Sequence, residues 1–197
     1  MGRTQCRSAQ ELVVNPDDLA SLIKRRRSNL FIDANSVVSH SDITALADAA
    51  QWAPNHKRTW PLRICVVTGD SRLQLGHVIA DAMQQRGDEA AKVEKTRTKY
   101  TRSPLVIVVA YAQGTSSSET IENSYAVAAG VQNLLLTAEV RGYAALWGSP
   151  AKGSNDAINE FCGFSPTDTV VGLIYVGRPN QSAPNVDRPP THITFRD

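Results

Sequence analysis

The spacing of apolar residues predicts that the chain opens with two helices. Apolar residues at intervals of three and four follow the capping sequence 15–18, which places the basic residues 24–27 at the C-terminal end of the first helix. The same periodicity returns over 43–50, between N-cap candidates at 39–42 and the proline at position 54. Two helices are therefore expected before the first strand.

Apolar runs and helical patterns alternate from residue 62 onward. The β-branched run 62–68 predicts a strand, and the continuous apolar run 105–111 predicts a strand that is covered on both faces. The segment 84–103 carries six lysines and arginines, which is typical of a solvated helix, and a lid is the alternative. Further strands are expected at 144–147 and 169–176, and further helices over 73–83, 121–141 and 155–161.

The order of these elements predicts a sandwich of helices around a small sheet, of the α+β or α/β class. The whole chain, 1–197, is expected to form a single domain, with an irregular lead-in at 1–16 and a proline-rich tail at 178–197. The tail has too little apolar pattern to fold on itself and could lie across a partner subunit. Neither the glycine-rich fingerprint of a Rossmann site nor a Walker A sequence follows a predicted strand, so any nucleotide cofactor must be held in another way.

The composition is that of a soluble globular protein, with 42% hydrophobic and 20% charged residues. The apolar run 104–112 is too short to span a bilayer, and the polar start at 1–10 does not resemble a signal peptide. Cys6, Cys65 and Cys162 lie far apart, without the spacing of a disulfide framework or a zinc site. A cytoplasmic location is therefore expected, and no metal site is expected.

The basic cluster 24–27 has more than one interpretation. Cations at the C-terminal end of a helix are favoured by the macrodipole, so a solvated helix end is the simplest one. A site for an anion is another. The formal charge of +2 is too small to imply a nucleic-acid partner, and neither an aromatic platform nor a wider basic face accompanies the cluster.

Four separated segments resemble those of the nitroreductase family, in the family's order over about residues 17–180. The first is Arg26-Arg27-Ser28, and the second is the Ala-Pro-Asn-His-Lys sequence at 53–57. The third is the glycine-bounded, tryptophan-containing segment 142–149, and the fourth is the hydrophobic run that ends in Gly-Arg-Pro at 171–179. The resemblance, to the compact NAD(P)H-using members, implies a three-layer α/β/α sandwich with a small mixed sheet. It also implies an intertwined homodimer with FMN at the subunit interface and a tail that crosses to the partner.

The resemblance also implies which residues meet the cofactor. Two adjacent arginines and a serine can make charge-assisted hydrogen bonds to the FMN phosphate without a glycine loop. Trp52 stands where close relatives have an FMN-contacting arginine, so stacking or, more simply, packing in the core is expected of it. The residues expected to bind FMN are Arg26, Arg27, Ser28, Trp52, His56, Trp147, Gly148 and Ser149, and those expected to meet the nicotinamide nucleotide are Thr137, Ala138, Glu139, Val140, Arg141 and Gly142.

The activity that the resemblance implies is that of an FMN-dependent oxidoreductase. Hydride from NADH or NADPH would reduce a nitroaromatic, a quinone or a similar acceptor by a ping-pong mechanism, and the flavin rather than a catalytic side chain would do the chemistry. Basic residues of the family are absent at Leu30 and Gly148, and Arg25 or Arg58 could compensate for the one missing at Gly148. These departures leave open a non-catalytic FMN-storage or sensor protein. A dehalogenase or a flavin-fragmenting enzyme is a further alternative that no residue specifically favours.

Overall fold

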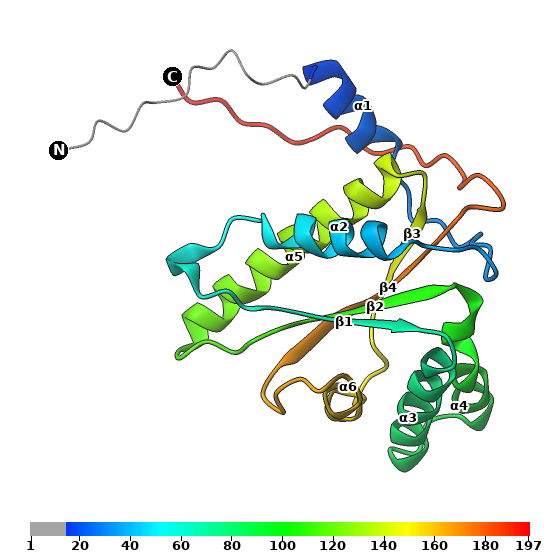
Figure 1. The fold of residues 1–197 in the computed structure, drawn as a ribbon. Helices are drawn as coiled ribbons and strands as arrows, with labels where there is room; N and C mark the ends of the chain where they lie inside the picture. Colours follow the sequence, from blue (N-terminus) through cyan, green and yellow to red (C-terminus); the bar gives the residue numbers. More distant parts are fainter. Residues whose placement is uncertain (1–14) are drawn as a thin grey trace.

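Two layers of helices enclose a four-stranded sheet in the computed structural model, which describes residues 15–197 (Figure 1). The strands are β1 (Leu62–Thr68), β2 (Leu105–Tyr111), β3 (Ala144–Gly148) and β4 (Thr169–Gly177), and the helices are α1 (Pro16–Arg25), α2 (His40–Gln51), α3 (Ser71–Gln85), α4 (Ala90–Arg97), α5 (Ser117–Val140) and α6 (Asn155–Cys162), with short 3-10 turns η2 (His56–Arg58) and η3 (Lys99–Arg102). Helices α2 and α5 cover one face of the sheet, and α3, α4 and α6 cover the other. The predicted α+β sandwich is confirmed.

The sheet has the order β1-β2-β4-β3, and its three ladders are all antiparallel. The chain leaves β1 through α3 and returns through α4, and this helix pair brings it back to the end of the sheet where β1 stopped, so β2 runs in the opposite direction. Within residues 15–197, parallel pairing is confined to an isolated bridge between Ser28 and Ala145. The expectation of a mixed sheet is therefore met only at that bridge.

Strand β2 is buried on both faces, as its continuous apolar sequence predicts. Residues 105–110 are all buried. Leu105, Ile107 and Val109 pack with α2 and α5, whereas their neighbours in the strand pack with α3 and α6. The sheet thus separates two apolar clusters that share no side chains.

The charged segment 84–103 belongs to the outer helical layer. It forms α4 and η3, and the side chains of Val93 and Tyr100 are buried in the same cluster as the apolar residues of α3. Its lysines and arginines are exposed except Arg97 and Lys99, which are half-buried. The alternative of a lid is wrong, because the apolar side chains of the segment are part of the core.

Helices α2 and α5 cross at close range. A Cβ atom on Gly130 would lie 2.6 Å from the carbonyl oxygen of Ala50, and the side chain of Asn133 donates a hydrogen bond of 3.2 Å to the carbonyl oxygen of Ala49. The predicted start of α2 is confirmed, since the Ser39 hydroxyl accepts a hydrogen bond from the backbone of Asp42 at 3.1 Å. No helix in residues 15–197 combines the length and apolarity that a membrane crossing requires.

Replacing Gly130 by alanine should lower the free energy of unfolding by about 1–3 kcal/mol, because the added methyl group would collide with the α2 backbone. The gain in helix propensity, about 1 kcal/mol, does not offset such a collision. Urea denaturation followed by circular dichroism measures the change. Gln132→Ala, at an exposed position of the same helix, is the control and should change stability by less than about 0.5 kcal/mol. An unchanged or higher stability for Gly130→Ala would show that the two helices separate without cost.

Candidate functional site

The basic segment after α1 lies against the edge strand β3. The chain becomes extended at Arg26, Ser28 forms the parallel bridge with Ala145, and the backbone N–H of Asn29 donates to the carbonyl oxygen of Ala145 at 3.0 Å. The structure therefore brings together two segments that are far apart in the sequence, 26–28 and 142–149. Both were expected to contribute to one cofactor site.

Alternate residues of this extended segment point to different surroundings, as in any extended chain. Arg25, Arg27 and Asn29 line a pocket of about 480 Å³, whereas Arg26 and Ser28 do not. Burial and, after it, the nearby Arg188 lower the pKa of Arg26. The three residues expected to share a phosphate are thus divided between two environments.

Trp147 is held across the sheet by its neighbours on β4. Its indole Nε1 donates a hydrogen bond of 3.0 Å to the carbonyl oxygen of Val171, which is the extra residue of a β-bulge. A Cβ atom on Gly172 would collide with the same indole, so only glycine leaves room for it. A Cβ on Gly148 would in turn lie 3.2 Å from the ring of Tyr175. No named strand within residues 15–197 pairs with the outer edge of β3, which leaves backbone groups next to Trp147 available for a ligand.

The His56 loop has a strained backbone. Lys57, Arg58 and Trp60 all have positive φ angles, of 56°, 54° and 49°. Asn55 holds this conformation, because its side chain accepts a hydrogen bond from the backbone of Trp60 at 2.9 Å and donates one to Thr59 at 3.0 Å. The His56 side chain is exposed and lies 3.8 Å from the carboxylate of Glu122 on α5.

The structure does not bring His56 to the basic segment. Arg25 pairs with Glu139 at the C-terminal end of α5, at 3.4 Å, whereas His56 pairs with Glu122 near the start of the same helix. The two glutamates lie about 25 Å apart, since an α-helix rises about 1.5 Å per residue. Within one chain, the expected FMN residues therefore form two separate groups.

Trp52 does not pack in the core, which corrects the simpler of its two sequence interpretations. Its residue is 86% exposed, because α2 ends there and the indole extends beyond the helix. It lines an apolar groove of about 520 Å³ between α1, α2 and α5. The other lining residues are Leu19, Leu22, Ala49, Asn133, Leu136, Thr137, Val140 and Arg141.

The residues 137–142, which were expected to contact the nicotinamide nucleotide, also lie in different environments. Glu139 and Gly142 line the 480 Å³ pocket. Ala138 has no exposed surface, since it packs against the sheet, so its side chain is not available to a nucleotide. Val140 is exposed beside the apolar groove, and the Thr137 hydroxyl donates to the backbone of α5 at 2.9 Å.

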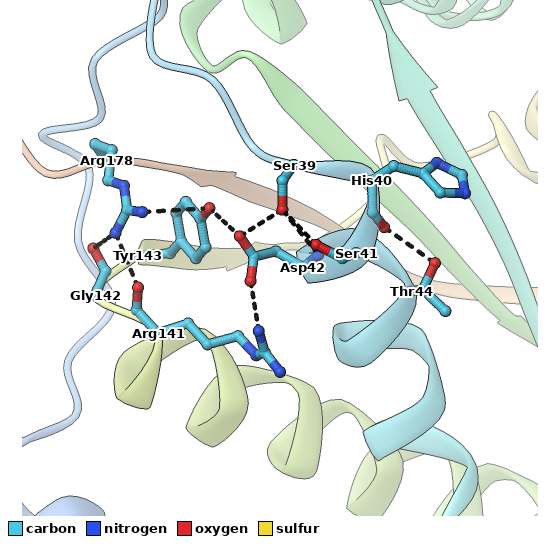
Figure 2. A network of polar contacts seen from close by, with 9 residues as sticks. All are labelled: Ser39, His40, Ser41, Asp42, Thr44, Arg141, Gly142, Tyr143 and Arg178. Carbon is cyan, nitrogen blue, oxygen red and sulfur yellow. Dashed lines mark hydrogen bonds and ion pairs between the residues drawn. The ribbon is translucent and has the colours of Figure 1, made fainter.

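A polar network lies at the end of α5 (Figure 2), and its residues Gly142 and Tyr143 line the pocket. The carboxylate of Asp42 accepts hydrogen bonds from the Tyr143 hydroxyl and the Ser39 hydroxyl, each at 2.7 Å, and pairs with Arg141 at 2.5 Å. These contacts, led by the one from Tyr143, lower the pKa of Asp42 to about 2. The guanidinium of Arg178 stacks on the Tyr143 ring at 4.1 Å and donates to the backbone oxygen of Arg141 at 2.8 Å. The network ties α2, α5 and the end of β4 together.

Sequence reasoning missed several residues of this site. Asp42, Tyr143, Arg178 and Gly172 have no spacing that links them, because they meet only after the sheet has formed. The tail residues that close the pocket were missed for the same reason. Asn29 could have been found, since a residue two positions beyond Arg27 lies on the same side of an extended chain. The tail lining comprises Pro179, Asn180, Gln181, Ser182, Ala183 and Asn185.

Comparison with known proteins finds similarity to the nitroreductase family over most of the chain. The model of the nitroreductase family matches residues 23–178. The Escherichia coli (strain K12) protein YdjA, named for an inferred NAD(P)H nitroreductase activity, is 26% identical over 183 residues, which cover 91% of this chain and 99% of that protein.

Solved structures share the fold. A nitroreductase-like family protein from Bacillus cereus superposes with a TM-score of 0.77 at 25% identity, covering 89% of this chain and 95% of that one. The FMN-dependent nitroreductase NfnB from Mycobacterium smegmatis, solved in complex with NADPH, has a TM-score of 0.68 at 16% identity, with coverage of 83% and 88%.

Asp42→Asn should lower the midpoint of thermal unfolding at neutral pH, because the amide cannot replace the charge-assisted contacts with Arg141 and Tyr143. The folded-state pKa of about 2 lies below the ordinary value of 3.8, so this stabilisation is complete above the ordinary value and is lost as the pH falls through about 2. The difference between variant and wild type should therefore narrow over that pH range in scanning calorimetry. Asp48→Asn, at an exposed position of the same helix, is the control, and an equal effect there would rule out the network as the cause.

Gly172→Ala should push the Trp147 indole off β4 and lower the free energy of unfolding by about 1–3 kcal/mol. The fluorescence of Trp147, read in a background with Trp52 and Trp60 replaced by phenylalanine, should change with it. Adding Trp147→Ala removes the colliding group, so the double variant should lose less stability than the sum of the single variants. Additive losses would contradict the contact.

Proposed function

The chain belongs to the nitroreductase family, and from this premise we propose that it is an FMN-dependent oxidoreductase that uses NADH or NADPH to reduce a small acceptor, such as a nitroaromatic or a quinone. The observation that carries the proposal is the meeting of 26–28 with the edge strand β3, which creates a cationic segment next to open backbone groups. The NAD(P)H nitroreductase name of YdjA and the FMN and NADPH of NfnB support it.

Arg26 and Ser28 fit an FMN phosphate. Arg26 and Ser28 are two positions apart in an extended chain and lie outside the pocket that Arg27 lines, so they can act together. Arg26 is partly buried and close to a second arginine, Arg188, so an anion beside it would relieve the repulsion between like charges. We therefore assign the phosphate to Arg26 and Ser28, while Arg27 faces the other way.

Strand β3 would hold the rest of the cofactor. The backbone of Trp147, Gly148 and Ser149 continues from the phosphate side along the open edge of the sheet. Trp147 is fixed by its bond to Val171. FMN, when bound, supplies the redox chemistry, with hydride taken up from NAD(P)H in one half of a ping-pong cycle and given to the acceptor in the other. The side chains of this protein would then bind and orient the cofactor and substrates, and they would exclude water from the site.

The separation of His56 from Arg26 supports a homodimer. The two groups lie at opposite ends of α5, about 25 Å apart along its axis, which exceeds the length of one FMN molecule. A two-fold axis that pairs α5 with its copy in the antiparallel direction would bring the His56 loop of one subunit to Arg26 and Ser28 of the other. Each site would then contain residues from both chains.

Exposed apolar surface supports the same assembly. Trp52 and Val140 are exposed beside the groove between α1, α2 and α5, where a second copy could cover them. In the tail, Ile193 and Phe195 are 63% and 83% exposed. We propose that residues 1–197 form one domain and that the tail crosses to the partner after Asn185, since its first residues bind their own chain.

The nicotinamide nucleotide would contact the exposed members of the 137–142 stretch. Glu139 and Gly142 face the 480 Å³ pocket, and Val140 lies beside the groove on the other side of α5. Ala138 packs against the sheet, and Thr137 lines the groove while its hydroxyl donates to the backbone of α5. In this assignment, FMN and the nicotinamide nucleotide both bind near the C-terminal end of α5.

Reconstitution with FMN followed by anaerobic addition of NADH or NADPH tests the proposed activity. We expect flavin absorbance that survives desalting and that bleaches with the nucleotide, then returns when a quinone or nitroaromatic is added. Stable absorbance that NAD(P)H does not bleach would favour the storage or sensor alternative. A colourless protein would contradict FMN binding altogether.

Mixed dimers test whether the site is shared between subunits. Arg26→Ala and His56→Ala should each weaken FMN binding by about tenfold or more as homodimers, because each removes a polar contact from every site. In a heterodimer of the two variants, one site carries both substitutions and the other carries neither, so half of the wild-type FMN should be recovered. If each site lies within one chain, the heterodimer contains no intact site. Lys24→Ala, outside both groups of residues, is the control for charge.

A further inference from the structure

Two cysteines that are far apart in the sequence meet between β1 and α6. Cys65 lies in the middle of β1, and Cys162 is the last residue of α6, which covers the same face of the sheet as α3 (Figure 1). Both are free thiols, both are half-buried, and both pack against the same apolar cluster. Their side chains are in direct contact, because the Cys162 thiol donates a hydrogen bond to Cys65.

A neighbouring polar link holds β1 and α6 together beside this contact. Arg63 lies two residues before Cys65, so its side chain leaves β1 on the same face. Its guanidinium pairs with the buried carboxylate of Asp168 at 3.7 Å, and the backbone oxygen of Asp168 accepts a hydrogen bond of 2.7 Å from the side chain of Asn159. Asn159 and Cys162 are three positions apart in α6, which places them on one side of the helix. The thiol contact is therefore one of two adjacent links between the same elements.

The two thiols differ in how readily they lose a proton. The hydrogen bond from Cys162 lowers the pKa of Cys65, although burial acts in the opposite direction. The same hydrogen bond and then burial raise the pKa of Cys162. Because the thiolate is the reactive form of cysteine, Cys65 is the nucleophile of the pair and Cys162 is its protonated neighbour.

We propose that Cys65 and Cys162 are a redox-active pair that hydrogen peroxide converts to a reversible disulfide. The Cys65 thiolate attacks one peroxide oxygen, the O–O bond breaks, and the released hydroxide takes up the proton that Cys65 had lost. Cys65 is then a sulfenic acid. The Cys162 sulfur attacks the Cys65 sulfur, the S–O bond breaks, and the hydroxyl group leaves with the Cys162 proton as a second water. Two thiols are oxidised, and one peroxide is reduced to two water molecules.

The end of α6 suits the formation of this bond. The sulfur atoms of a disulfide lie about 2.05 Å apart, so thiols that are already in contact have a short distance to close. Cys162 is followed by Gly163 in the left-handed conformation, with a φ of 68°, so the bond would form at a helix end and not in a helix interior. The disulfide would fasten α6 to the edge strand β1. Neither cysteine is assigned to FMN or to the nucleotide, so the pair does not depend on the proposed function.

Peroxide treatment of the reduced full-length chain tests the pair. Cys6, which lies outside the described residues, is replaced by serine so that two cysteines remain. After treatment of the folded protein, we expect both free thiols to be lost, as counted with a thiol-reactive dye in denaturant. Mass spectrometry of a tryptic digest should show one species that joins the peptides of Cys65 and Cys162. Dithiothreitol should restore both thiols.

Single variants in the same background test the role of each thiol. In Cys162→Ser, the serine hydroxyl can still donate a hydrogen bond, so peroxide should give a Cys65 sulfenic acid that dimedone traps. In Cys65→Ser, the remaining thiol has no thiolate partner beside it and should react with peroxide at least about tenfold more slowly. Melting curves establish that each variant is folded.

Two results would overturn the proposal. One is that peroxide leaves Cys65 and Cys162 reduced in the folded protein, or oxidises them without joining them. The other is that the two folded single variants react with peroxide at equal rates, which would contradict the assignment of Cys65 as the nucleophile. A failure of the proposed function is a separate outcome, because thiol counts and peptide masses are read without FMN.

Discussion

The burial of β2 on both faces is the constraint on which the rest of this structure depends. A strand without a polar face is stable only between two apolar layers, and the chain supplies them as α2 with α5 on one side and α3 with α4 and α6 on the other. Antiparallel neighbours β1 and β4 complete its hydrogen bonding. The edge strands then become the places where backbone groups are free, and the candidate site lies at one of them.

Helix α5 has two consequences that follow from its length. It is long enough to cover one face of the sheet, and Gly130 lets α2 approach it closely. The same length separates Glu122 from Glu139, and with them the His56 loop from the basic segment. A helix that one subunit needs for its core thus prevents that subunit from assembling the proposed flavin site alone, which is a physical reason for the proposed dimer.

The segment after α1 places cations in two directions because it is extended. In a helix, Arg26 and Arg27 would both extend from the surface toward solvent. Here the bridge between Ser28 and Ala145 fixes the alternation, so that Arg26 accompanies Ser28 while Arg27 enters the pocket below the tail.

The sequence by itself determined the elements of the fold. The strand at 62–68, the doubly covered strand at 105–111 and the Ser39 cap of α2 were all predicted from local patterns, because period, branching and capping act over a few residues. The resemblance to the nitroreductase family named Arg26, Arg27, Ser28 and the 142–149 segment as site residues, and their roles stay predictions. The tertiary structure decided the rest. Antiparallel pairing, the exposure of Trp52, the fit of Trp147 over Gly172 and the unpartnered Nε of Arg27 depend on contacts between distant residues, and no local pattern of apolar and polar positions records such contacts.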